Sequence, residues 1–152
     1  FIYKYQKKVN FFPKNPNISL IGLAFKGNPV TDDLRGSMAV EVFKALKTKF
    51  KLSKFFGYDP VVSDSKIKKF GLKKTNSISD SFKNKNLVII LNNHYVFSKM
   101  PIEKLAKKLK KPAIIYDFWN HFDANKLKLP KKVDYIALGS HNKNKYHYKN
   151  HV

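Results

Sequence analysis

The sequence predicts an α/β fold built on an open, parallel sheet with helices on both of its faces. Three observations predict it. Continuous apolar runs of strand length alternate along the chain with segments of helical periodicity. The runs are apolar throughout rather than at every second residue, which is typical of strands that are buried on both faces. Polar loops close the runs, and strands that alternate with helices form parallel sheets through crossover connections.

Five segments are expected to form the strands. They share a continuous apolar or aromatic composition and are followed by a polar loop: residues 17–25, 54–58, 87–91, 113–116 and 133–138. The fifth segment gives the weakest pattern.

Three helices are expected between the strands. Ser37 suits the N-cap of a helix that runs to about Lys49. A short helix is expected around Ile78 and Phe82, and another begins at Pro101, which suits the first helical position. The first and last helices share a stripe of apolar residues at helical spacing: Met38, Val42, Phe43 and Leu46 in the first, and Ile102, Leu105, Ala106 and Leu109 in the last.

These elements fill one domain, which we place at residues 17–139. Residues 1–16 are predicted to be a linker or the end of a preceding helix, and residues 140–152 a polar, disordered tail. The histidines of this tail are expected to be solvated rather than metal-binding: His141, His147 and His151. Since the chain begins at Phe1 rather than at methionine, we expect it to be a piece of a longer protein.

The composition limits the possible functions. The absence of cysteine excludes disulfides, thiolate metal sites and a cysteine nucleophile within this sequence. No uninterrupted apolar run approaches the roughly 20 residues of a membrane span, so no membrane partner is expected. Because 43% of the residues are hydrophobic, we expect a folded protein, and the absence of cysteine fits a reducing, cytoplasmic origin.

The formal charge of +21 raises one alternative, a non-catalytic basic module that binds nucleic acid. The lysines, however, are spread over almost every segment, as at 107–108, 110–111 and 131–132. This spread favours solvated lysine-rich faces over a single nucleic-acid surface. A bound diphosphate needs only about two or three cationic or N–H contacts, so the charge far exceeds what such a ligand requires.

Arg35 is the only arginine among the 31 basic residues. Lysine acts as a point charge, whereas the planar guanidinium can bind phosphate or carboxylate with two parallel hydrogen bonds. Arg35 therefore marks a place where this geometry matters. Two roles are open on the residues alone: binding of a ligand, or an ion pair with Asp32 or Asp33.

Ligands of open parallel sheets bind beyond the carboxyl ends of the strands, near the point where the strand order reverses. The loops after the first four expected strands place a largely polar and aromatic set at this edge: Phe25, Lys26, Gly27, Asp59, Asn92, Asn93, His94, Asp117, Trp119 and Asn120. Such a set can hydrogen-bond a base, a sugar and a phosphate.

The same set does not have the composition of a catalytic or metal site. The sequence has no evident Ser–His–Asp order, no histidine pair at metal-ligand spacing and no Gly-x-Gly-x-x-Gly loop after the first strand. A hydrogen-bonding role is favoured for His94 over that of a general base. Asp117 is favoured as the anchor of a loop. We therefore expect no catalytic residue and no metal ligand in this chain.

Two blocks of sequence resemble a known family: residues 22–27 (GLAFKG) and 31–39 (TDDLRGSMA). They are similar to the signature that opens the C-terminal domain of the UDP-glucose/GDP-mannose dehydrogenase family. Further matches follow in order at residues 58–60, 88–94 with Phe97, and 115–119. The resemblance extends over about residues 17–138 and implies a Rossmann-like sheet.

The resemblance implies an activity for the complete protein. Enzymes of that family oxidise the C6 alcohol of a nucleotide sugar to a carboxylate, with two NAD and a covalent cysteine thioester. Their N-terminal Rossmann domain binds NAD, and their C-terminal domain binds the nucleotide and closes the cleft. By this resemblance the chain is the substrate-binding domain of an NAD-dependent nucleotide-sugar 6-dehydrogenase, of the UDP-glucose or UDP-N-acetylmannosamine type. The implied enzyme is a homodimer that makes uronates for surface polysaccharide, and this piece is expected to be inactive alone.

The resemblance also implies roles for single residues. Phe25 and Lys26 would contact the nucleotide of the substrate, and Arg35 would reach toward NAD on the other domain or on a partner subunit. The full substrate-binding set that we expect is Phe25, Lys26, Asn92, Asn93, Trp119 and Asn120. Many family members have an arginine shortly after the fourth-strand aspartate, whereas residues 117–120 (DFWN) contain none, which favours an N-acetylated or otherwise different hexose.

Overall fold

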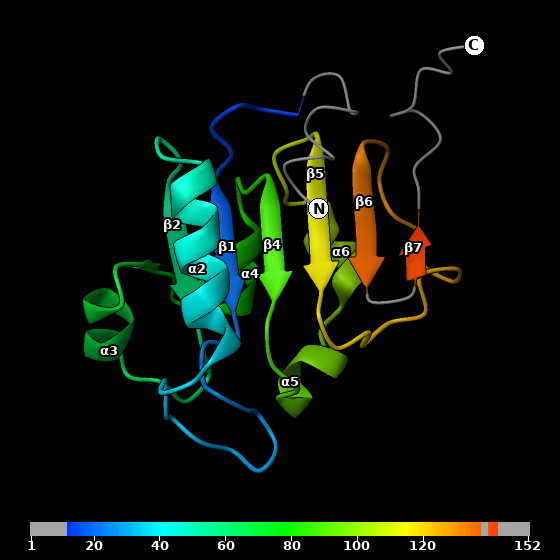
Figure 1. The fold of residues 1–152 in the computed structure, drawn as a ribbon. Helices are drawn as coiled ribbons and strands as arrows, with labels where there is room; N and C mark the ends of the chain where they lie inside the picture. Colours follow the sequence, from blue (N-terminus) through cyan, green and yellow to red (C-terminus); the bar gives the residue numbers. More distant parts are fainter. Residues whose placement is uncertain (1–11, 138–139, 143–152) are drawn as a thin grey trace.

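The computed structural model describes residues 12–137 and the backbone of residues 140–142. Within these residues the strands form one sheet in the order β3-β2-β1-β4-β5-β6-β7 (Figure 1). The strands are β1 (Ile18–Ile21), β2 (Phe55–Tyr58), β3 (Lys73–Lys74), β4 (Leu87–Ile90), β5 (Ala113–Asp117), β6 (Val133–Ala137) and β7 (Ser140–Asn142). The strands β1 to β6 pair in parallel, and β7 pairs antiparallel with β6. The predicted open parallel sheet is therefore confirmed, with one antiparallel strand added.

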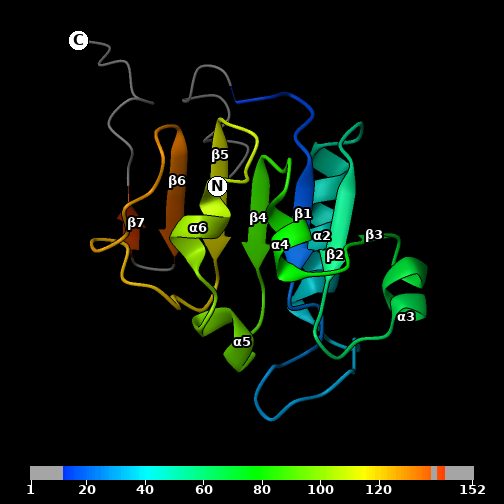
Figure 2. The same cartoon turned by 180° about the vertical axis from the view of Figure 1, so that it is seen from behind.

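Helices cover both faces of this sheet, as Figures 1 and 2 show. The helices are α2 (Met38–Lys49), α3 (Asp64–Lys69), α4 (Ile78–Phe82), α5 (Tyr95–Ser98) and α6 (Ile102–Ala106). The helix α2 lies on one face, and α4 and α6 lie on the other. The helix α3 lies beside the β3 edge, and α5 lies beyond the carboxyl end of β4 (Figure 1).

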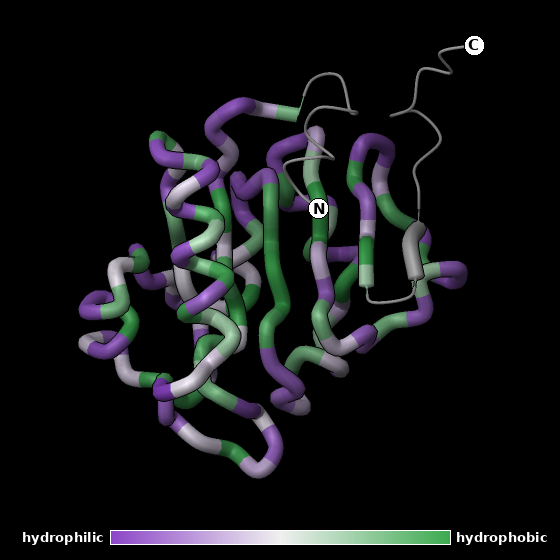
Figure 3. Tube along the Cα trace, viewed as in Figure 1, coloured by the Kyte–Doolittle hydropathy of each residue, from purple (hydrophilic) through white to green (hydrophobic). Residues whose placement is uncertain are grey.

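The central strands are buried on both faces, which explains their unbroken apolar sequence. Leu20 and Ile89 belong to the core beneath α2, whereas the next residues, Ile21 and Ile90, belong to the core beneath α6. Because successive side chains point to opposite faces of a strand, both sets of positions have to be apolar. Figure 3 shows the resulting hydrophobic stretch along β4.

The first strand is shorter than the predicted segment 17–25. Gly22 adopts a φ of +77°, which turns the chain out of the strand after Ile21. The N–H groups of Leu23 and Ala24 then donate to the Asp59 carboxylate rather than to a neighbouring strand. The apolar run continues past Ile21 because Leu23 and Ala24 are buried in the core although they do not belong to a strand. Their apolar character made the predicted strand too long.

The helix α2 begins and ends as predicted. The Ser37 side chain caps it by accepting from the Ala39 N–H at 3.1 Å, and Lys49 is its last residue. Phe43 and Leu46 are buried, but Met38 is exposed, so its place in the apolar stripe was wrong.

The start of α6 also differs from the prediction. Pro101 is the N-cap of α6 rather than its first helical residue. Helix ends are commonly displaced by one position in this way.

The structure describes part of the two segments that flank the predicted domain. Phe12, in the segment predicted as a linker, is buried in the core beneath α2. The strand β7 occupies the first residues of the predicted tail, and its backbone includes His141, whereas His147 and His151 lie outside the described residues. Among the residues that the structure describes, no helix has the length and apolar character needed to cross a membrane.

Candidate functional site

The candidate site lies at the carboxyl ends of β1, β4 and β5, where the strand order reverses. From β1 the chain first moves outward to β2 and β3, and then crosses back to β4 on the other side of β1. Ile21 of β1 pairs with both Tyr58 of β2 and Ile90 of β4, so the loops after these strands leave the sheet side by side. This is the place where open α/β sheets bind their ligands.

The loop after β1 is fixed from below by Asp59. The Oδ2 atom of this buried carboxylate accepts from the N–H groups of Leu23 and Ala24, at 2.7 and 3.0 Å. Its Oδ1 atom accepts from Val61 and Val62, at 2.8 and 3.1 Å. Four N–H donors compensate the buried charge. Asp59 therefore anchors the loop and is not presented to a ligand.

Asn92 also lies beneath the loop. Its side chain is 2% exposed, donates to the Ala24 carbonyl at 3.3 Å and accepts from the His94 N–H at 3.2 Å. A Cβ atom at Gly22 would lie 2.7 Å from Asn92 Oδ1, so the Asn92 side chain can occupy this position only because residue 22 has no side chain. Asn92 therefore braces the β1 loop against the β4 loop and is itself buried.

Asn93 holds the next part of the same loop. Its Oδ1 atom accepts from the N–H groups of Gly27 and Asn28, at 2.9 and 3.2 Å. Gly27 lies against the neighbouring backbone so closely that an added Cβ would be 2.0 Å from the His94 nitrogen. The β1 and β4 loops thus form one unit, in which glycine is required by space at residue 27.

His94 is a structural residue, as the sequence favoured. It is the N-cap of α5, where its Nδ1 atom accepts from the Val96 N–H at 3.3 Å. The imidazole is buried and stacks on the Tyr95 ring with 4.7 Å between the ring centroids. A ring used as a helix cap in this way is not placed as a general base.

Phe25 and Lys26 project from the top of the braced loop. The Phe25 side chain is 55% exposed, although its N–H is fixed to the Asp33 carbonyl at 2.7 Å. Lys26 is exposed, and its ammonium pairs with none of the described residues. One aromatic face and one cation are therefore exposed on a loop whose backbone is fixed by hydrogen bonds.

The guanidinium of Arg35 forms the ion pair that the residues left open as one alternative. Its Nε and Nη2 atoms donate to the Asp33 carboxylate at 2.8–3.1 Å, and the Arg35 N–H donates to the same group. These hydrogen bonds lower the pKa of Asp33 to about 2. Asp32 pairs with Lys66 instead. The Arg35 side chain is still 91% exposed, so the pair leaves part of the guanidinium open to another molecule or domain.

The loop after β5 is built around the buried carboxylate of Asp117. It accepts from the N–H groups of Trp119 and His121, from His121 Nδ1 at 2.9 Å and from the Tyr135 hydroxyl at 2.7 Å. Burial alone would raise the pKa of Asp117, but the hydrogen bonds from His121 and Tyr135 outweigh it and hold the pKa below its usual value. Asp117 is thus a loop anchor, as the sequence favoured.

Trp119 and Asn120 lie on this anchored loop and face outward. The Trp119 indole N–H donates to the Leu91 carbonyl at 3.0 Å, while half of the side chain remains exposed. Asn120 is exposed and has a φ of +53°, a conformation that asparagine tolerates better than most residues. An aromatic face and an amide therefore join Phe25 and Lys26 at the same edge of the sheet.

Sequence reasoning missed His121 and Tyr135, which complete the Asp117 cluster. Tyr135 reaches Asp117 only because β6 pairs with β5, a contact that the local sequence does not reveal. The only available signal was that Asp117 and His121 lie four residues apart. This spacing brings two side chains together on a helix, but no helix was expected in this loop. The Nε2 atom of His121 is buried and has no hydrogen-bond partner among the described residues.

The site as a whole offers groups that can bind and orient a ligand. Its outward side chains offer aromatic faces, an ammonium group and an amide. No cluster of histidine or carboxylate side chains within residues 12–137 could hold a metal ion.

The sequence matches a family model that covers most of this region. The UDP binding domain of the UDP-glucose/GDP-mannose dehydrogenase family matches residues 19–124. The chain is also 29% identical over 132 residues to a UDP-glucose 6-dehydrogenase of Rickettsia felis, a match that covers 84% of this chain and 28% of that protein.

Two solved structures share the fold. A UDP-D-ManNAc dehydrogenase from Pyrococcus horikoshii superposes with a TM-score of 0.70 at 22% identity, over 93% of this chain and 30% of that one. A UDP-N-acetyl-mannosamine dehydrogenase from S. aureus superposes with a TM-score of 0.64 at 22% identity, over 91% and 29%. The chain therefore spans less than a third of the length of these relatives.

Proposed function

Because the chain belongs to the UDP-glucose/GDP-mannose dehydrogenase family, in which it matches the UDP binding domain, we propose that it binds the nucleotide sugar for an NAD-dependent 6-dehydrogenase. The complete enzyme would oxidise the sugar C6 alcohol to a carboxylate. One observation supports the binding role most directly. Phe25, Lys26, Trp119 and Asn120 are all exposed at the reversal of strand order, and all lie within the matched residues.

Each of these residues would make a different kind of contact. The exposed rings of Phe25 and Trp119 offer apolar surfaces for the base and the sugar, and the Lys26 ammonium would pair with the diphosphate. The Asn120 amide would hydrogen-bond the sugar. Asn92 and Asn93 would contribute by holding the β1 loop in place, since their side-chain oxygens already accept from backbone N–H groups of the loops.

The oxidation itself would depend on parts of the protein outside this chain. The sequence contains no cysteine, so the thioester-forming nucleophile of the family cannot come from it. NAD would accept the hydride, and a separate domain of the complete protein would make most of the contacts to NAD. Within this chain, Arg35 would supply the contact to NAD through the exposed part of its guanidinium. This piece alone would be inactive as a dehydrogenase.

The substrate would be a UDP sugar of the glucose or N-acetylmannosamine type, in keeping with the activities named for the relatives. The absence of an arginine in residues 117–120 favours an N-acetylated sugar. We place the complete enzyme in the cytoplasm, as a homodimer that supplies uronates for surface polysaccharide.

A titration of this chain with UDP and with UMP tests the binding role. A half-cleft without its closing domain should bind UDP with a Kd near the millimolar range, about 4 kcal/mol. The expected result is a set of saturable amide shifts at residues 23–27, 92–94 and 117–120, larger for UDP than for UMP. Shifts that follow the lysines over the whole surface, equal for both ligands and steeply salt-dependent, would instead favour the nucleic-acid alternative.

A further inference from the structure

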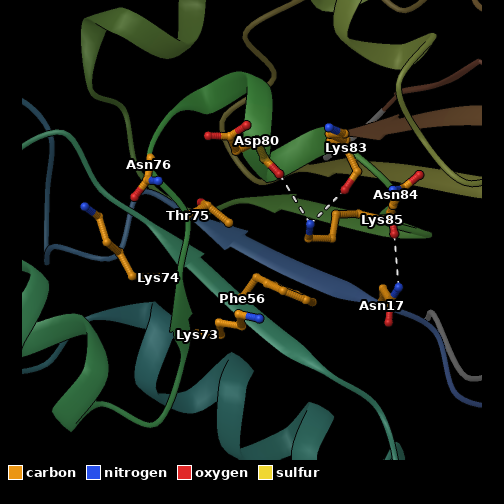
Figure 4. A pocket seen from close by; sticks show the side chains of 10 residues that line it. All are labelled: Asn17, Phe56, Lys73, Lys74, Thr75, Asn76, Asp80, Lys83, Asn84 and Lys85. Atoms are coloured by element: carbon orange, nitrogen blue, oxygen red, sulfur yellow. Dashed lines mark hydrogen bonds between the residues drawn. The ribbon is translucent and has the colours of Figure 1, made fainter.

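A pocket lies beside α4, away from the candidate site. It has a volume of about 300 Å³. It is lined by Phe56 of β2, by both residues of β3, and by residues 83–85, which follow the C-terminal end of α4 (Figure 4). Asn17 and Asn84, at the amino-terminal sides of β1 and β4, close its other end. The pocket therefore shares none of the loops that form the candidate site.

The pocket exists because α4 is short. This helix has five residues and packs against β1 and β2, but it leaves the Phe56 side chain of β2 at the lining of the pocket (Figure 2). The Phe56 ring is instead covered by lysine side chains. Lys85 Nζ lies 4.0 Å from the ring centroid and Lys73 Nζ lies 5.9 Å from it. Cations over an aromatic face are stabilised by its quadrupole, so the ring holds positive charge at the pocket.

The positive charge of the pocket is only partly neutralised. Lys74 pairs with Asp64 at 2.8 Å. Lys85 is buried, and its ammonium donates to the carbonyls of Lys83 and Asp80, at 2.8 and 3.3 Å. Burial lowers the pKa of Lys85, because the charged ammonium has lost part of its hydration. An anion bound nearby would stabilise the charged form of Lys85.

Two further ammonium groups have no carboxylate partner. Neither Lys73 nor Lys83 forms a salt bridge with any residue in the described part of the chain, and both are exposed. Asp80 is the one carboxylate that lines the pocket. Four lysines and a single acid thus line the pocket, and two of these lysines, Lys73 and Lys83, are tied to no carboxylate of the described residues.

We propose that this pocket binds a small molecule that carries a diphosphate group, as a second ligand site of the domain. Lys73 and Lys83 would contact the two phosphate groups from opposite sides, and Lys85 would lie beneath them. Lysine binds phosphate as a mobile point charge, and the spread of ammonium groups around the pocket suits a ligand with two anionic centres better than a single carboxylate. The volume leaves room for an organic group attached to the diphosphate.

The test uses the whole 152-residue chain and inorganic pyrophosphate as the probe, at a constant ionic strength of about 0.15 M. Amide shifts should saturate at residues 73–76 and 83–85. The double substitution Lys73→Glu and Lys83→Glu should weaken this binding by about 10-fold or more, since hydrogen bonds to charged groups are the stronger ones. Lys73→Gln with Lys83→Gln removes the charge without reversing it and should weaken binding in the same direction.

The matched control is Lys107→Glu with Lys110→Glu. These lysines are exposed beyond α6, outside the pocket, and their substitution changes the net charge by the same amount. Pyrophosphate binding at the pocket should stay within about two-fold of the original. Equal losses in the two double variants would show general charge attraction and overturn the proposal. So would an absence of saturable shifts at residues 73–76 and 83–85, or binding there of poly(U) RNA without binding of pyrophosphate.

Discussion

Arg35 uses one edge of its guanidinium for Asp33 and exposes the rest. The Nε and Nη2 atoms donate to Asp33, whereas Nη1 has no partner among the described residues. The ion pair and the proposed contact to NAD are therefore compatible, because Asp33 orients the guanidinium and leaves donors for a second anion. A lysine could satisfy one of these two partners but could not present two parallel hydrogen bonds.

In the full-length protein, Arg35→Lys should raise the KM for NAD by about 5- to 150-fold, which corresponds to about 1–3 kcal/mol. The KM for the nucleotide sugar should change little, since Phe25 and Lys26 remain in place. Steady-state kinetics with each substrate varied, beside a melting curve, measures both effects. Asp33→Asn serves as the comparison. If both substitutions lower the melting temperature and leave the KM for NAD unchanged, Arg35 is structural.

Asp117 should couple stability to pH. Its pKa is lowered in the folded state, so its stabilising contribution is complete above the pKa of the unfolded chain, near 3.8, and is lost as the pH falls through the lower folded value. Asp117→Asn should cost about 1–3 kcal/mol near pH 7 and flatten the pH dependence of the unfolding free energy below about pH 5. Urea denaturation between pH 3 and pH 7 measures this. Parallel pH profiles for the two proteins would contradict the assignment.

At the level of elements, the loops after β1 and β4 act as one unit, in which Gly27 of the first loop packs directly against the His94 backbone of the second. In Gly27→Ala the new Cβ would collide with the His94 backbone, and the loop that holds Phe25 and Lys26 would have to move. We expect a lower melting temperature and at least a roughly 10-fold loss of UDP affinity, because a displaced loop no longer presents its contacts together.

Gly36→Ala is the matched control for Gly27→Ala. Gly36 has a φ of +67°, but a Cβ there would meet its nearest atoms, in the Phe25 ring, at an ordinary 3.8 Å. The substitution should therefore lower stability by about 1–2 kcal/mol through backbone strain alone, with UDP affinity retained. Calorimetry and the amide titration compare the two variants. Similar losses of UDP affinity in both would mean that the loop needs no close contact at residue 27.

The fold was largely predictable because its strands are buried on both faces and therefore have continuous apolar sequences. The edge of the sheet at which the candidate site lies was predictable because parallel strands all end at the same edge. The strand β3 was not predictable, since it consists of Lys73 and Lys74 at the sheet edge and has no apolar pattern. The location of the outward residues Lys26 and Trp119 could be inferred from the loops. The inward roles of Asp59 and Asn92 could not, because their partners are backbone N–H and carbonyl groups of loops distant in sequence.

The whole molecule carries a net charge of +21, because it has 31 lysine and arginine residues and only 10 aspartate and glutamate residues. Like charges on the folded surface repel one another, and salt screens this repulsion over about 10 Å at 0.1 M. Raising the NaCl concentration from about 20 to about 300 mM should stabilise the chain by about 1 kcal/mol, which raises the Tm by about 2–4 °C. The variant with Lys107→Glu and Lys110→Glu should respond less. A Tm that falls with salt would mean that the surface ion pairs outweigh the repulsion.

The shortness and charge of β3 affect how the domain behaves at high concentration. A sheet edge is a template on which a foreign strand can add, and a long, flat, apolar edge invites aggregation. On the β3 side this sheet ends in a strand of two residues, both lysines. An incoming strand would find few backbone groups to pair with and two ammonium groups beside them. Amyloid-like stacking of copies through this edge is therefore disfavoured.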